Sequence, residues 1–107
     1  MSKSLIPKLE AIKQRYNEVA DLIIQPDVIS DQKKYSSLNK EYSDLGKIVA
    51  VFDQYKQTLN TIDESDEIIA DGSDKEFVEM AKLEKNEAIQ RIPGLEEELK
   101  VLLIPKD

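Results

Sequence analysis

The fold is decided by residues 30–70, which read SDQKKYSSLNKEYSDLGKIVAVFDQYKQTLNTIDESDEIIA. Apolar side chains recur along this stretch in steps of three and four residues, the spacing that places them on one face of an α-helix. Either Ser30 or Asp31 can cap the start of this helix with a side-chain oxygen. The pattern predicts a helix over 30–70, about 60 Å long at 1.5 Å per residue. Its stripe consists of Tyr35, Leu38, Tyr42, Leu45, Val49, Phe52, Tyr55, Leu59 and Ile62.

A second stripe precedes this stretch and predicts a helix over about 4–24. Ser4 is a suitable N-cap, and Pro7 falls in the first turn, where a missing N–H does no harm. Gln25-Pro26-Asp27 should end the helix, because a residue before proline avoids the α region. The stripe consists of Leu5, Leu9, Ile12, Tyr16, Val19 and Ile23.

A third helix is predicted over 73–104. Gly72 provides the turn before it, and Ser73 with Glu76 has the spacing of a capping box. Pro93-Gly94 should kink or interrupt this helix, because proline removes one helical hydrogen bond and crowds the preceding turn. Its apolar positions are Phe77, Met80, Ala81, Ala88, Leu95, Leu99, Leu102 and Leu103.

The stripes together predict an all-α fold. No stretch alternates with a period of two residues, so we expect no β-sheet. At 107 residues and 12.2 kDa the chain has the size of a single domain over 1–107. We expect an elongated antiparallel bundle of three long helices, the third kinked or split near Pro93.

The composition argues against an enzyme. The chain has no His, Cys or Trp, so it lacks an imidazole base, a thiol nucleophile and the usual zinc ligands. Gly46, Gly72 and Gly94 are isolated and form no phosphate-binding loop. We therefore predict no catalytic residue, no cofactor and no metal site. The acidic groups Asp63–Glu67 and Glu96–Glu98 lack the loop pattern of a calcium site and are interpreted as solvated helix faces.

The aromatic residues allow two interpretations. They could stack on nucleic-acid bases, but no basic residues alternate with them, and they fall on the helical stripes, so we expect core packing. The long stripe could also form an intermolecular coiled coil, but its aromatic residues and the other two helices favour packing within one chain, hence a monomer. The six aromatic residues are Tyr16, Tyr35, Tyr42, Tyr55, Phe52 and Phe77.

The charge and the N-terminus bear on location and partners. The formal net charge is −7, which predicts weak or no independent RNA binding, because phosphate contacts need clustered Lys or Arg. No apolar run is long enough for a membrane span or a signal peptide. We therefore expect a cytoplasmic protein with no membrane partner.

Three segments resemble bacterial class-I peptide chain release factors, and the resemblance extends over essentially the whole chain. Lys8-Leu9-Glu10, followed by Arg15-Tyr16 and Glu18-Val19, is similar to the start of that family. Residues 31–45, DQKKYSSLNKEYSDL, resemble its second helix. Residues 99–107, LKVLLIPKD, are similar to the junction with the central domain in the branch that reads UAA and UAG.

The resemblance implies that residues 1–107 are the N-terminal helical domain of a longer factor for translation termination at UAA and UAG. Members of the family carry a Gly-Gly-Gln loop for peptidyl-tRNA hydrolysis and a tripeptide for stop-codon reading, and neither occurs here. The implied role is therefore docking to the ribosome near the stalk base, close to the GTPase-type release factor. The contact residues stay unassigned. The alternatives are the UGA/UAA-reading paralogue and a free-standing helical adaptor or coiled-coil scaffold.

Overall fold

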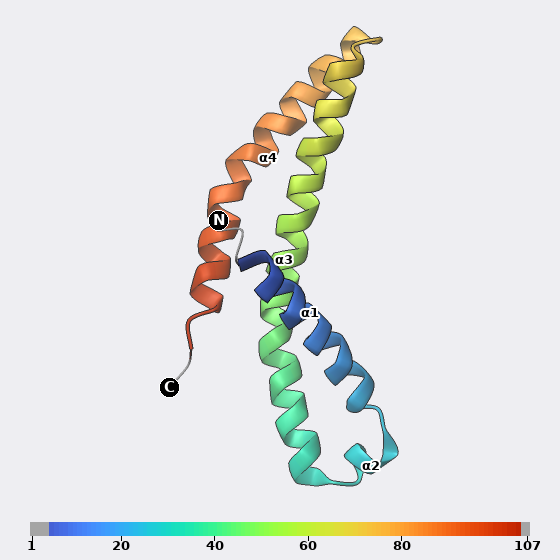
Figure 1. The fold of residues 1–107 in the computed structure, drawn as a ribbon, viewed down its shortest axis with the longest axis vertical. Helices are drawn as coiled ribbons and strands as arrows, with labels where there is room; N and C mark the ends of the chain where they lie inside the picture. The colour runs from blue at the N-terminus through green and yellow to red at the C-terminus, as the bar shows by residue number, and fades with distance from the viewer. Residues whose placement is uncertain (1–4, 106–107) are drawn as a thin grey trace. The chain divides into compact units, whose positions relative to one another are not determined.

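The structure is a computed structural model that describes residues 5–105, and it is almost entirely helical. Within these residues there is no β-strand, so the all-α prediction is confirmed. The chain divides after Ala50 into two compact units, and the longest helix belongs to both. The prediction of a single domain over 1–107 stays a prediction. The helices are α1 (Leu5–Leu22), α2 (Pro26–Ile29), α3 (Gln32–Asp71) and α4 (Lys75–Leu102), as Figure 1 shows.

In the first unit, α1 lies beside the first half of α3 (Figure 1). α1 ends two residues before the predicted limit, and the proposed cap Ser4 lies outside the described residues. Asp31 caps α3, because its Oδ1 accepts a hydrogen bond of 3.1 Å from the backbone N–H of Lys34. Of the two predicted caps, Asp31 is therefore the one used. The buried apolar residues of this unit are Leu9, Val19, Val28 and Val49.

The short helix α2 was missed by the sequence analysis. Pro26 was expected only to end the preceding helix, but it also begins a new turn, in which the N–H of Ser30 donates to the carbonyl of Pro26 over 3.0 Å. Proline suits the first position of a helix, because its missing N–H would have no helical partner there and its φ is already helical. The buried Val28 then anchors this turn to the unit.

In the second unit, a tight turn joins α3 to α4, and α4 runs back along the second half of α3 (Figure 1). Gly72 occupies the left-handed region at φ 65°, where a side chain would be strained. Asp74 is the N-cap of α4: its Oδ1 accepts from the N–H groups of Glu76, at 2.9 Å, and Phe77, at 3.4 Å. The predicted Ser73–Glu76 capping box is therefore wrong, because the Ser73 hydroxyl donates to the Asp71 carboxylate instead.

α4 passes through Pro93 without a break, so the predicted interruption at 93–94 is wrong, while the alternative, a kink there, stays a prediction. The reason lies in the residues that follow. Leu95 and Leu99 are buried, at 7% and 0% exposure, so packing holds the last turns in helical register despite the lost hydrogen bond. The buried residues of the second unit are Val51, Phe52, Tyr55, Thr58, Ser65, Ala81, Ala88, Leu95 and Leu99.

Among the described residues, no helix combines the length and the apolar character that crossing a membrane requires.

Candidate docking surface

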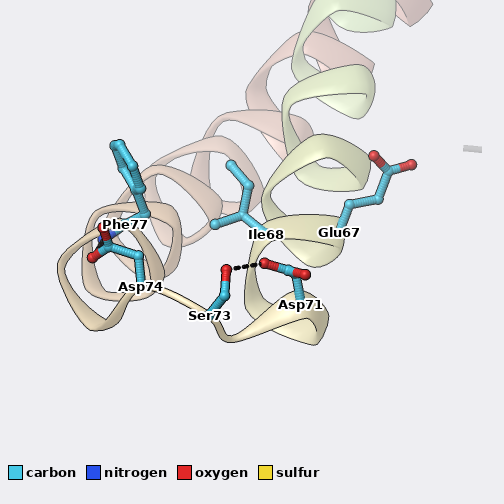
Figure 2. A pocket seen from close by; sticks show the side chains of 6 residues that line it. All are labelled: Glu67, Ile68, Asp71, Ser73, Asp74 and Phe77. Carbon is cyan, nitrogen blue, oxygen red and sulfur yellow. Dashed lines mark hydrogen bonds between the residues drawn. The ribbon is translucent and has the colours of Figure 1, made fainter.

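The turn between α3 and α4 forms a pocket of about 450 Å³, shown in Figure 2. We call it the tip pocket. The residues that line it come from the last turns of α3, the connecting loop and the first turn of α4. They are Glu67, Ile68, Asp71, Ser73, Asp74 and Phe77.

Two apolar side chains lie in the tip pocket and remain exposed to solvent. Ile68 is 42% exposed and Phe77 is 60% exposed, and they lie near each other across the two helices (Figure 2). The helical stripes predicted that Phe77 and Tyr35 lie in the core, and both predictions are wrong, since Tyr35 is also exposed, at 39%. Each lies in the first turn of its helix, where the neighbouring helix no longer covers the stripe.

The polar residues of the tip pocket are all acidic or neutral. Glu67, Asp71 and Asp74 contribute carboxylates, and no Lys or Arg lines the pocket. Asp74 and Asp71 are both engaged in the turn, Asp74 as the N-cap of α4 and Asp71 as the acceptor for Ser73 (Figure 2). The pocket therefore presents apolar surface beside negative charge.

A second hollow, of about 150 Å³, lies farther along the α3–α4 pair. It is more polar than the tip pocket, and Arg91, Glu84 and Glu87 are among the residues that line it. No exposed large apolar side chain lines it, so it offers little for a partner to bury. Its lining residues are Gln57, Thr58, Thr61, Glu84, Glu87, Ala88 and Arg91.

Polar contacts also join α3 and α4. The Tyr55 hydroxyl donates to Oε2 of Glu96 over 3.2 Å, and Lys85 Nζ lies 2.5 Å from Asp66 Oδ1. Burial raises the pKa of the Tyr55 phenol, and the hydrogen bond to Glu96 raises it further. Tyr55 is only 5% exposed, so we interpret this contact as structural.

In the first unit, Arg15 and Glu41 form a bidentate ion pair that joins α1 to α3. Nε and Nη2 of Arg15 donate to the two carboxylate oxygens of Glu41 over 2.7 Å and 2.9 Å. The hydrogen bond from Arg15 lowers the pKa of Glu41, and burial opposes this only in part. The hydrogen bond to Glu41 in turn raises the pKa of Arg15.

An aromatic stack reinforces the same pair of helices. The rings of Tyr16 and Tyr42 are 4.7 Å apart between centroids and inclined by 12°. Gly46 gives the Tyr16 ring room, because a Cβ at position 46 would lie 3.2 Å from its Cε1. These tyrosines therefore pack on each other, as the core interpretation of the stripe predicted.

The acidic groups Asp63–Glu67 and Glu96–Glu98 do not come together as a metal site. Within residues 5–105, no group of three or more His, Cys, Asp or Glu side chains is placed to hold a metal ion. Only Glu67, from the first of the two acidic groups, lines the tip pocket.

A model of the family described as the PCRF domain matches residues 12–107, nearly the whole chain. The chain belongs to the PCRF domain family. The resemblance to class-I peptide chain release factors is thereby confirmed. The PCRF match begins within α1 and includes α2, α3, α4 and the tip pocket.

Several curated relatives of this PCRF domain carry the name peptide chain release factor 1. This chain is 56% identical over 103 residues to the protein of that name from Flavobacterium johnsoniae. It is 48% identical to the one from Staphylococcus carnosus and 43% identical to the one from Clostridioides difficile. In each case the match covers 96% of this chain and 29% of the relative. The chain thus spans less than a third of the length of these relatives. No solved structure matches it.

Proposed function

We propose that these residues form the N-terminal domain of a class-I release factor that directs peptide release at UAA and UAG. The observation that carries the proposal is the PCRF match over residues 12–107, together with relatives named peptide chain release factor 1. That shared name favours the UAA/UAG branch over the UGA/UAA-reading paralogue, and the family match favours a factor domain over a free-standing adaptor. The place of action would be the cytoplasm, where ribosomes translate.

The contribution of this domain is docking to the ribosome, and hydrolysis and decoding belong to other parts of the factor. Support comes from the sequence, which holds neither a Gly-Gly-Gln loop nor a His or Cys that could act on the ester. Within residues 5–105, the tip pocket is lined by carboxylates, a hydroxyl and apolar groups. The second hollow adds an amide and the guanidinium of Arg91, which stays protonated and cannot act as a general acid or base. The docking partners would be the stalk-base region of the ribosome and the GTPase-type release factor, with the domain itself monomeric.

A release assay tests this division of labour. Ribosomes stopped at UAA and carrying labelled peptidyl-tRNA are mixed with three proteins: the 107-residue chain, the full-length factor and the full-length factor without residues 1–107. We expect release by the full-length factor, none by the chain above the no-factor control, and weaker ribosome binding after the deletion. Release by the chain alone would contradict the proposal, and so would unchanged ribosome binding after the deletion.

A further inference from the structure

The tip pocket has the composition of a surface that anchors a side chain from another molecule. Ile68 and Phe77 come from different helices, yet both leave a large part of their apolar surface in water. The pocket volume of about 450 Å³ falls within the range of about 300–1,000 Å³ that is common for ligand sites. Contiguous exposed apolar surface that is rimmed by polar residues is a feature of interaction sites.

Local contacts within the chain also hold the turn that carries the pocket. The left-handed Gly72 fixes the turn, the Ser73 hydroxyl bonds to Asp71, and the Asp74 carboxylate holds the first turn of α4. A surface that is already ordered loses little conformational entropy on binding, so more of the contact energy appears as affinity.

The negative charge of the tip pocket favours a protein over a nucleic acid as the partner. Three carboxylates line the tip pocket, and no cation does. Nucleic acid would bring phosphates against these carboxylates and is disfavoured. The start of α4 does not attract an anion either, because Asp74 already accepts from the N–H groups of Glu76 and Phe77.

The apolar surface extends along α4 beyond the pocket. Met80, one turn after Phe77, is 55% exposed. A methionine side chain adapts to partners of different shape, because it is unbranched and polarisable. A partner segment with apolar residues at successive positions would therefore find a continuous contact surface.

From these observations we propose that the tip pocket binds a cationic apolar segment of a protein. An aliphatic or aromatic side chain of the segment sits against Ile68 and Phe77, and Lys or Arg residues beside it face Glu67, Asp71 and Asp74. This proposal rests on the docking function above and identifies the chemistry of one docking contact.

The first experiment removes the charge of the pocket and preserves its geometry. In the full-length factor we replace Glu67→Gln, Asp71→Asn and Asp74→Asn, since an amide oxygen can still accept from Ser73 and can still cap α4. The control, Asp63→Asn with Glu97→Gln and Glu98→Gln, makes the same change in net charge at exposed positions outside the pocket. The probe is the 70S ribosome stopped at UAA.

The expected result is a fall of about threefold to tenfold in the association rate at low salt for the pocket variant. The control variant should change by less than about twofold, and the difference between the two should shrink as salt rises. Equal rates for both triple variants would overturn the proposal, since the effect would then belong to net charge alone.

The second experiment tests the apolar contact. Phe77→Ser should weaken ribosome binding by about tenfold, whereas Ile29→Ser should change it little, although Ile29 is similarly exposed at 58%. A photo-crosslinking residue at position 77 should then label a protein at a peptide in which Lys or Arg flanks an apolar residue. A crosslink to ribosomal RNA, or none on ribosomes that bind the factor, would overturn the proposal.

The two proposals can fail separately. If the tip variants bind and crosslink like the parent while deletion of residues 1–107 still weakens binding, docking stands and the tip pocket is not its contact. If the deletion has no effect, the docking function fails, and the tip-pocket proposal fails with it.

Discussion

Gly46 and Gly94 both lie within helices, but their surroundings differ. Gly46 lies against the Tyr16 ring, whereas at Gly94 a Cβ would meet no atom within 4 Å apart from the adjoining residues and the backbone of its own helix. Both sit inside long helices, where glycine costs up to about 1 kcal/mol relative to alanine. Only at Gly46 does packing give the small residue a structural reason.

Gly94→Ala should therefore stabilise the second unit by about 0.5–1 kcal/mol. Gly46→Ala should gain less, because the new methyl group would crowd the Tyr16 ring at 3.2 Å and disturb its stack on Tyr42. Urea unfolding followed by circular dichroism measures both. A Gly46→Ala variant that is more stable than Gly94→Ala would show that the Tyr16 ring moves aside freely.

The pair between Arg15 and Glu41 makes part of the stability depend on pH. The folded state lowers the pKa of Glu41 from its ordinary value of 4.5, so the pair stabilises the fold above that value. This contribution is lost as the pH falls through the lowered pKa of the folded state. Glu41→Gln should therefore reduce stability near pH 7 and have less effect at an acid pH below the lowered pKa of the folded state, where the parent carboxylate is protonated as well.

Thermal unfolding of the parent and Glu41→Gln at several pH values checks this prediction. Asp63→Asn, which removes an exposed carboxylate of α3, serves as the control for a general charge effect. A difference in melting temperature between the parent and Glu41→Gln that stays constant from neutral to acid pH would contradict the role of the pair. Because the side chains of Arg15 and Glu41 are 43% and 35% exposed, the effect should be modest.

At the scale of elements, the start of α4 depends on a single carboxylate. Asp74→Ala removes the acceptor for two backbone N–H groups and should destabilise the second unit by about 1 kcal/mol. Asp74→Asn should keep most of the stability, and Ser73→Ala should cost less than Asp74→Ala. Melting temperatures of the three variants test this order. A larger loss for Ser73→Ala would restore the capping box that the sequence predicted.

Pro93 should limit the stability of α4. Within a helix, proline removes a hydrogen bond and crowds the preceding turn, at a cost of up to about 3 kcal/mol. Pro93→Ala should therefore raise the melting temperature, and Gln90→Ala, at an exposed position of the same helix, should change it little. Equal melting temperatures for both variants would mean that the native backbone already accommodates Pro93 without strain.

Helical periodicity predicted the long elements, and its failures have physical causes. The stripes located α1, α3 and α4 to within a few residues, because long helices repeat the same signal many times. The four-residue α2 carries no periodic signal and depends on the first-position preference of Pro26. Periodicity also cannot tell where a neighbouring helix stops covering a stripe, so it placed the exposed Phe77 in the core.

For the same reason, the tip pocket could not be found from the sequence. Its lining residues are separated by a turn whose geometry brings the end of α3 against the start of α4. The only signal available was Gly72 followed by acidic residues and an aromatic residue. That signal becomes informative only when the exposure of Ile68 and Phe77 is known.

At the scale of the whole molecule, charge predicts how the chain behaves with nucleic acid. Asp and Glu outnumber Lys and Arg by 22 to 15, and the isoelectric point is about 4.7. Within residues 5–105, Arg15, Lys82 and Lys85 are each paired with a carboxylate, which reduces their availability to phosphates.

We therefore expect the 107-residue chain to show no saturable binding to an unrelated RNA duplex at about 150 mM salt, since electrostatic affinity needs several phosphate contacts. Fluorescence anisotropy with a labelled duplex measures this, and a basic RNA-binding protein in the same buffer confirms that the assay detects binding. Lowering the salt to about 50 mM should not restore binding, because dilution of counterions strengthens repulsion between like charges as well as attraction. Tight binding whose affinity falls steeply with salt would show that the chain gathers its cations on one face, and that its acidic balance does not govern contact with RNA.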